Sequence, residues 1–203
     1  MSPLSPLSLA RRISSTPSRD RDVRALLKRH LADLHTGTPT LVLDELGLCE
    51  GDVRVDVAAV NGELSGFEIK SPADTLARWP KQRRGYSKVV DRAWLVATDK
   101  ALGAATPPSW WGLIRIVETR DQLAIRVLRE AALNPSPQPL SIAQLLWHAE
   151  ALEVLERRGS ARGVRSKPRA FAWQRLLDTL TLDELRSEVR AALRARPIER
   201  KFW

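Results

Sequence analysis

Apolar residues recur at spacings of three and four between residues 20 and 34, which predicts an amphipathic helix. The apolar side of this helix carries Val23, Leu26, Leu27, Leu31 and Leu34. His30 lies on the same side, so we interpret it as a core or boundary histidine and not as a metal ligand. Residues 1–19, ahead of this helix, are rich in Ser, Pro and Arg without any acid, and we expect a disordered basic arm there.

Short apolar runs bounded by turn residues predict strands in the middle of the chain. The runs lie at Leu41–Leu46, Val53–Val60, Leu64–Lys70, Trp94–Thr98, Leu113–Val117 and Leu123–Val127. Asn61-Gly62, between the second and third runs, is typical of a β-hairpin. A helical stretch over roughly 73–90 follows the third run, with Pro80 as a kink or a new start.

The last third of the chain is entirely helical in pattern. Asn134–Pro139 contains three prolines and indicates a linker. Ser141 with Gln144 has the spacing of a capping box, which predicts a helix ending near Gly159, and a further helix is expected near 168–178. Thr181 with Glu184 has the same spacing and predicts a final helix to about Ala195. The chain thus divides into the arm, an α/β core over 20–133 and a helical extension over 140–203.

Composition narrows the class of protein. The 203 residues carry 33 Lys and Arg against 24 Asp and Glu, and this net charge of +9 favours a polyanionic partner such as nucleic acid. No apolar run is long enough to span a bilayer, so no membrane is expected. The single cysteine, Cys49, cannot form an intrachain disulfide, which fits a cytoplasmic protein. The oligomeric state stays open.

Charged residues interrupt two of the predicted strands. Alternate strand residues share a face, so Glu68 and Lys70 point one way while Phe67 and Ile69 point the other. By the same rule, Asp56 shares a face with Arg54 and Ala58, and Val53, Val55 and Val57 share the opposite one. Burying an unpaired charge is costly. These groups therefore either form a structural salt bridge or collect a hard cation such as Mg²⁺ or Mn²⁺ between Asp56 and Glu68.

The hairpin between these strands decides whether the two acids can meet. A two-residue turn at Asn61-Gly62 would pair Asp56 with Phe67, and Asp56 and Glu68 would then point to opposite faces. A shared site requires an odd offset. A three-residue loop with Gly62 in the left-handed conformation and a bulge, or a bulge elsewhere, would supply it. We predict that bulge and a short distance between the two carboxylates.

Asp56 followed by Glu68-Ile69-Lys70 resembles the signature of the PD-(D/E)xK nuclease superfamily. Glu45 lies upstream, where many members place another acid. Gln82 and Tyr86 resemble the Gln-x-x-x-Tyr element of the RecB-like branch, and the whole run resembles small uncharacterised bacterial members. The resemblance covers roughly residues 40–117. One departure is Val55, which stands before the aspartate in place of proline.

The resemblance implies an α/β protein with a restriction-endonuclease-like mixed β-sheet flanked by helices, here with an all-helical C-terminal extension. It implies a Mg²⁺ or Mn²⁺ cofactor and hydrolysis of phosphodiester bonds in DNA, in a setting such as DNA repair or phage defence. The implied catalytic residues are Asp56, Glu68, Lys70, Glu45, Gln82 and Tyr86. The implied metal-site residues are Asp56, Glu68, Ile69 and Glu45. Gln82 and Tyr86 are expected to face the carboxylates.

Basic residues outside the motif form two candidate nucleic-acid contacts. The first group lies in the helical stretch after Lys70 and comprises Arg78, Lys81, Arg83, Arg84 and Lys88. The second lies in the basic loop Arg157–Arg169 and comprises Arg162, Arg165, Lys167 and Arg169. Either group is also explained by a solvated helix face, or by a bundle that only covers the sheet. Two alternatives to a nuclease therefore remain: a catalytically silent nucleic-acid-binding module of the same fold, and a partner-binding protein.

Overall fold

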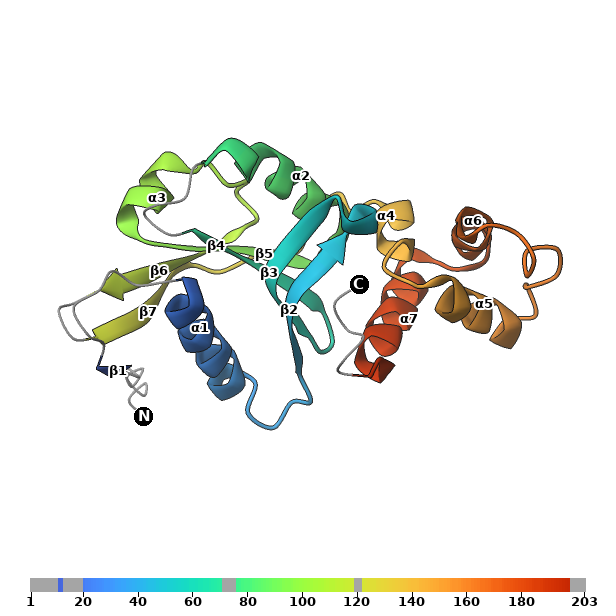
Figure 1. Ribbon diagram of the computed structural model, residues 1–203, viewed down its shortest axis with the longest axis horizontal. Coiled ribbons are helices and arrows are strands. Elements are labelled where there is room, and N and C mark those ends of the chain that lie inside the picture. The colour runs from blue at the N-terminus through green and yellow to red at the C-terminus, as the bar shows by residue number, and fades with distance from the viewer. Residues whose placement is uncertain (1–10, 13–19, 71–75, 119–121, 198–203) are drawn as a thin grey trace.

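The computed structural model describes residues 11–12, 20–70, 76–118 and 122–197 (Figure 1). One mixed sheet has the strand order β1-β7-β6-β5-β4-β3-β2. Its strands are β1 (Arg11–Arg12), β2 (Leu41–Leu48), β3 (Val53–Val60), β4 (Leu64–Lys70), β5 (Arg92–Ala97), β6 (Gly112–Glu118) and β7 (Gln122–Arg129). β4, β5 and β6 run parallel, and every other neighbouring pair is antiparallel.

Helices cover both faces of this sheet. They are α1 (Asp20–Leu34), α2 (Trp79–Val89), α3 (Asp99–Ala104), α4 (Pro139–Ala143), α5 (His148–Arg157), α6 (Arg169–Thr179) and α7 (Leu182–Ala195), with short 3₁₀ turns η1 (Cys49–Gly51) and η2 (Leu76–Arg78). α1 packs on one face, and α2 with α3 lies on the other (Figure 1). The expected α/β class, with a flanked mixed sheet and C-terminal helices, is confirmed. α3 was not expected from the sequence.

β4 alternates as its sequence predicts. Phe67 and Ile69 join the apolar cluster beneath α1, whereas Leu64 joins the cluster on the α2 face. Gly66 also lies on the α2 face, because a Cβ added there would be 3.1 Å from the ring of Tyr86. The charged residues of β4 therefore have α2 as their neighbour.

β3 does not keep one alternation, and the predicted grouping of its valines is wrong. Val53 and Val55 pack in the α2-side cluster, but Val57 packs in the α1-side cluster. The strand thus changes phase at Asp56. β2 changes phase opposite this point, where Glu45 has a φ of 57°. A left-handed residue in a strand acts as a bulge does and re-aims the side chains around it.

The β3–β4 hairpin has the predicted odd offset. Val60 pairs with Leu64, so three residues form the loop, and Val57 pairs with Phe67. This register places Asp56 opposite Glu68. The predicted reason was wrong, because Gly62 does not adopt a left-handed φ and this strand pair shows no bulge. The side chain of Asn61 stabilises the loop instead, since its oxygen accepts a 3.0 Å hydrogen bond from the Glu63 amide.

The helical extension differs from the expected pattern at its start. α4 begins earlier, with Pro139 in its first turn, and the N-cap Gln138 makes no side-chain cap. The expected Ser141–Gln144 capping box is therefore wrong, and the single expected helix is split into α4 and α5. The Thr181–Glu184 box is confirmed, since the Glu184 amide donates to the Thr181 hydroxyl and the Thr181 amide donates to Glu184.

The extension shares one apolar core with the sheet. Leu146, Leu176 and Leu193 belong to the same buried cluster as Val53 and Leu95.

No helix within the described ranges is long and apolar enough to cross a membrane.

A buried carboxylate also ties α7 to the sheet. Asp91 is 4% exposed and accepts a 2.7 Å hydrogen bond from the Leu64 amide. Arg186 and Arg190 of α7 form ion pairs with the same carboxylate at 2.9 and 3.4 Å. The extension is therefore held by polar contacts as well as by the shared core.

Candidate active site

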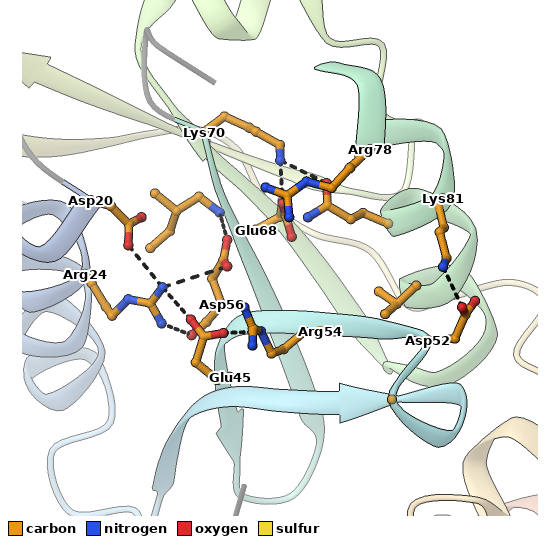
Figure 2. A pocket seen from close by; sticks show the side chains of 14 residues that line it. Asp20, Arg24, Glu45, Asp52, Arg54, Asp56, Glu68, Lys70, Arg78 and Lys81 are labelled. Atoms are coloured by element: carbon orange, nitrogen blue, oxygen red, sulfur yellow. Dashed lines mark hydrogen bonds and ion pairs between the residues drawn. The ribbon is translucent and has the colours of Figure 1, made fainter. Parts of the chain in front are cut away.

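A cavity of about 500 Å³ opens where β3 and β4 meet α1 and α2 (Figure 2). Ten charged side chains line it in equal numbers of each sign. The acids are Asp20, Glu45, Asp52, Asp56 and Glu68, and the bases are Arg24, Arg54, Lys70, Arg78 and Lys81. The predicted catalytic residues Asp56, Glu68 and Lys70 thus line one cavity whose walls are mainly charged.

Asp56 sits where β3 and β4 part. Their pairing ends at Val57 and Phe67, so the next residues no longer exchange backbone hydrogen bonds. The Asp56 carboxylate takes over this role and accepts a 2.8 Å hydrogen bond from the Ile69 amide. Asp56 and Glu68 face the same cavity. The two acids therefore line one cavity, as predicted, and the short distance between their carboxylates stays a prediction.

The Asp56 carboxyl is a weak acid in this setting. Burial and the nearby negative charge of Glu68 raise its pKa from 3.8 to about 7, against the opposing effects of the Ile69 amide and Arg24. Desolvation and a like charge both disfavour ionisation. A cation placed between Asp56 and Glu68 would relieve both effects.

Glu68 is 1% exposed and fully partnered. Its Oε1 lies 2.7 Å from the Lys70 ammonium, and its Oε2 accepts a 2.8 Å hydrogen bond from the Tyr86 hydroxyl. Burial raises the pKa of Glu68, while the charge and hydrogen bond of Lys70 oppose that change. A salt bridge between Glu68 and Lys70, one of the two alternatives that the sequence left open, is therefore present within the site.

α2 brings Gln82 and Tyr86 to these groups. Lys70 donates a 2.9 Å hydrogen bond to the Gln82 side-chain oxygen. Residues four apart share a helix face, which explains why Tyr86 reaches Glu68 from the same side. The expectation that both residues face the carboxylates is confirmed, and their roles in catalysis stay predictions.

α2 approaches the sheet closely because of a glycine. A Cβ added at Gly85 would lie 2.7 Å from a methyl group of Val53, closer than packed side chains allow. Tyr86 is fully buried beside Trp111, with ring centroids 5.2 Å apart. Burial raises the pKa of Tyr86 well above 10, so its hydroxyl remains a hydrogen-bond donor. Gly85 therefore positions a permanent donor at Glu68.

Arg24 of α1 is a site residue that the sequence did not predict, as are Asp20, Asp52 and Arg54. Its guanidinium lies 2.8 Å from Glu45 and 3.8 Å from Asp56, and it also donates to the Asp56 carbonyl at 2.5 Å (Figure 2). A sequence signal existed, since Arg24 follows Asp20 by four residues on the charged side of the helix, and the two are paired at 3.1 Å. That spacing alone is typical of ordinary surface pairs.

The donor set fits one small divalent cation. Mg²⁺ typically keeps several waters and uses one or two carboxylates, which Asp56 and Glu68 would supply. The Ile69 side chain packs beneath α1, so its backbone is the part at the cavity. Glu45 lines the cavity but is paired with both Arg24 and Arg54. Within the described ranges, no three His, Cys, Asp or Glu side chains cluster as a ready-made metal site.

The first basic group does not share one face. Arg78 and Lys81 line the cavity, with Lys81 2.5 Å from Asp52. Arg83 turns away and donates to the carbonyl of Thr106 at 3.1 Å. Arg84 is exposed and Lys88 is half-buried.

The second basic group lies on the surface of the extension. Arg162 and Lys167 are exposed. Arg165 lies 2.9 Å from Glu156, and Arg169 pairs with Glu50 of the η1 turn. The Arg169 contact brings one end of this group beside the sheet.

The sequence from residue 15 to residue 203 matches the family described as Bacteriophage P4 protein cII. The chain belongs to this family. No curated protein matches it. A solved protein of unknown function from Silicibacter pomeroyi is similar to this P4 cII family member with a TM-score of 0.43 and 21% identity, over 71% of this chain and 94% of that chain.

Proposed function

We propose that this P4 cII family member is a metal-dependent nuclease of the PD-(D/E)xK type, with a restriction-endonuclease-like core. One observation carries the proposal. Asp56 and Glu68 converge on one cavity from two parting strands, with Lys70 2.7 Å from Glu68. Gln82 and Tyr86 complete the arrangement from α2. DNA is the substrate that the resemblance favours.

The residues divide the chemistry among them. Asp56 and Glu68 would hold Mg²⁺ or Mn²⁺, which acidifies a bound water and offsets charge on a phosphate when present. The Lys70 ammonium, which lies 2.7 Å from Glu68, would orient the water or stabilise the extra negative charge of the transition state. Gln82 holds Lys70 in place, and Tyr86 fixes the orientation of Glu68. Arg78 and Lys81 contribute positive charge to the cavity wall, where a phosphate would bind.

A catalytically silent nucleic-acid-binding module is the second candidate. The observation that favours it is the pairing of Glu45 with Arg24 and Arg54, which satisfies the third acid without any metal. Retention of a 1% exposed carboxylate at Glu68 argues against it, because a pure phosphate binder gains nothing from a buried acid. A cytoplasmic setting and a role in DNA repair or phage defence stay predictions.

Cleavage of labelled nucleic acid tests the proposal. Purified protein is incubated with single- and double-stranded DNA and RNA in Mg²⁺, Mn²⁺ or EDTA. We expect metal-dependent cleavage by the wild type and none by Asp56→Asn, which removes a charge with little change of shape. Asp52→Asn is the matched control, because Asp52 lines the same cavity but is exposed and pairs with Lys81. Equal rates for Asp56→Asn and the wild type would refute the proposed site.

A further inference from the structure

A second cavity of about 500 Å³ lies beside the first, between the sheet edge and the helical extension. Glu45, Gly51 and Arg54 belong to the walls of both cavities. The far wall of the second cavity comes from the end of α4, the start of α5, and α6. Its volume is within the roughly 300–1,000 Å³ of typical small-molecule sites. The two cavities are therefore neighbours that share one wall.

The partition between the cavities is built from an unusual backbone segment. Glu45, Cys49 and Glu50 have φ values of 57°, 51° and 58°, and they are the non-glycine residues with positive φ in the described ranges. Such conformations are strained and cluster at functional sites. Glu50 accepts a 3.2 Å hydrogen bond from Gln144 and pairs with Arg169, so the strained turn is anchored to the extension across the second cavity.

The lining of the second cavity combines aromatic rings with guanidinium groups. Trp147 and Trp173 lie in its wall, and Arg196 and Arg169 sit over their rings at 4.2 and 5.1 Å. Arg54 lies at the border with the first cavity. Rings and guanidinium planes are the surfaces on which proteins stack unpaired nucleobases. The first cavity, in contrast, is lined mainly by charged groups.

His148, a residue of this wall, carries a buried polar atom without a partner among the described residues. The Nε2 of His148 is buried and makes no hydrogen bond with any residue in the described part of the chain. A buried polar atom without a partner is costly, so the His148 ring would gain from a turn that brings Nε2 to a ligand atom in the cavity. A nucleobase edge offers both donors and acceptors and can satisfy either tautomer of the ring.

We propose that the second cavity takes an unstacked nucleobase of the strand whose phosphate occupies the first cavity. The choice of a nucleic-acid strand rests on the proposed function. A polynucleotide presents an anion and a flat aromatic ring within one residue, and these match the charged cavity and the aromatic cavity on either side of the strained turn. The substrate class is therefore a strand with at least one unpaired base next to the phosphate bound at Asp56.

Base-dependent binding tests this inference without cleavage. Full-length protein in EDTA is titrated with a short fluorescent oligodeoxythymidylate and with an abasic strand of equal length and charge. We expect the wild type to prefer the strand with bases by about tenfold, the effect of one stacked base. Trp147→Ala should lose the preference while its affinity for the abasic strand is kept. Phe171→Ala is the matched control, because Phe171 is an aromatic residue 53% exposed on α6 and outside the cavity walls.

His148→Ala provides a second variant should Trp147→Ala fail to fold, and it should also reduce the preference. Equal affinity of the wild type for both strands would overturn the proposal. An apolar group of a protein partner would then be the alternative ligand of the cavity. A preference that survives in the folded variants would overturn the proposal as well. A preference for bases without metal-dependent cleavage would refute the proposed nuclease activity and support this base site. Metal-dependent cleavage without a preference for bases would support the nuclease activity and refute the base site.

Discussion

Asp56 combines a structural and a chemical role in a single side chain. Its carboxylate replaces a backbone partner for Ile69 where the strands part, and the same position places it beside Glu68. The cost of this placement is visible in its raised pKa of about 7. A group that the fold holds in an unfavourable state without metal is one that a cation would stabilise.

Asp56→Asn is expected to stabilise the metal-free protein at neutral pH. The folded state keeps a proton up to a pKa of about 7 that the unfolded state loses near 3.8, so the wild-type free energy of unfolding falls as pH rises through that window. The loss reaches at most about 4 kcal/mol above pH 7 and is absent below the unfolded pKa. Asparagine cannot ionise, so the variant does not lose this stability as the pH rises. Denaturant unfolding in EDTA across this range measures the difference, and parallel pH curves for the two proteins would contradict it.

Lys70→Met is expected to destabilise the metal-free protein and to abolish cleavage. The variant leaves Glu68 buried without its cation, and breaking a buried pair costs about 3–5 kcal/mol. Mg²⁺ should recover part of the loss, because it binds the acids in the folded state only. Lys81→Met, which removes an exposed pair, should change stability by less than about 1 kcal/mol. Thermal unfolding with and without Mg²⁺ gives the test, and equal effects of the two variants would argue against a special role for Lys70.

At the scale of elements, the site depends on how closely α2 approaches β3 and β4. Trp79 and Pro80 begin the helix, and the ring of Tyr86 lies over Gly66 of β4. Gly85 removes the one side chain that would separate the helix from Val53. The distances from Gln82 to Lys70 and from Tyr86 to Glu68 therefore follow from a helix–sheet contact.

Gly85→Ala is expected to push α2 from the sheet and to lower cleavage. The added methyl group would meet Val53 at 2.7 Å, and overpacking of this kind costs about 1–3 kcal/mol. Gly103→Ala in α3 is the matched control, since nothing lies within 4 Å and alanine favours a helix by up to about 1 kcal/mol. Unfolding free energies and initial cleavage rates of both variants are compared. Full activity in a folded Gly85→Ala protein would show that the α2 contacts do not matter to the reaction.

On the scale of the whole molecule, the helical extension is part of the fold and forms one wall of the second cavity. It shares the apolar core of the sheet, and Arg186 and Arg190 tie it to Asp91. At the second cavity, its Arg169 pairs with Glu50 of the η1 turn. Its basic loop is on the surface beside these contacts. We therefore expect a nucleic-acid strand bound as proposed to contact this loop.

Neutralising Arg162, Arg165, Lys167 and Arg169 together is expected to weaken DNA binding and flatten its salt dependence. Each lost phosphate contact lowers the slope of log affinity against log salt by about 0.9 on duplex DNA. Arg162 and Lys167 are exposed and should contribute most, whereas Arg165 and Arg169 are partly neutralised by Glu156 and Glu50. Affinities measured over a salt series give the slope. An unchanged slope would leave the loop as structural.

The sequence pattern by itself determined several local features of this protein. The alternation of β4, the helix over 20–34, the Thr181–Glu184 cap and the pairing of Glu68 with Lys70 are all decided by neighbours in sequence, because strand and helix periods and capping are local physics. The meeting of Gln82 and Tyr86 with β4 followed from helix spacing together with the family resemblance.

Only tertiary structure decided the rest. The phase change of β3 at Asp56 depends on the left-handed Glu45 in the neighbouring strand, and no period within β3 reveals it. Arg24 reaches Asp56 across 32 positions of sequence, and Gln144 reaches Glu50 across 94. Such contacts form because elements pack against each other. The physical reason is that side-chain periodicity encodes which face of an element is buried, whereas its partner is chosen by the packing of the whole chain.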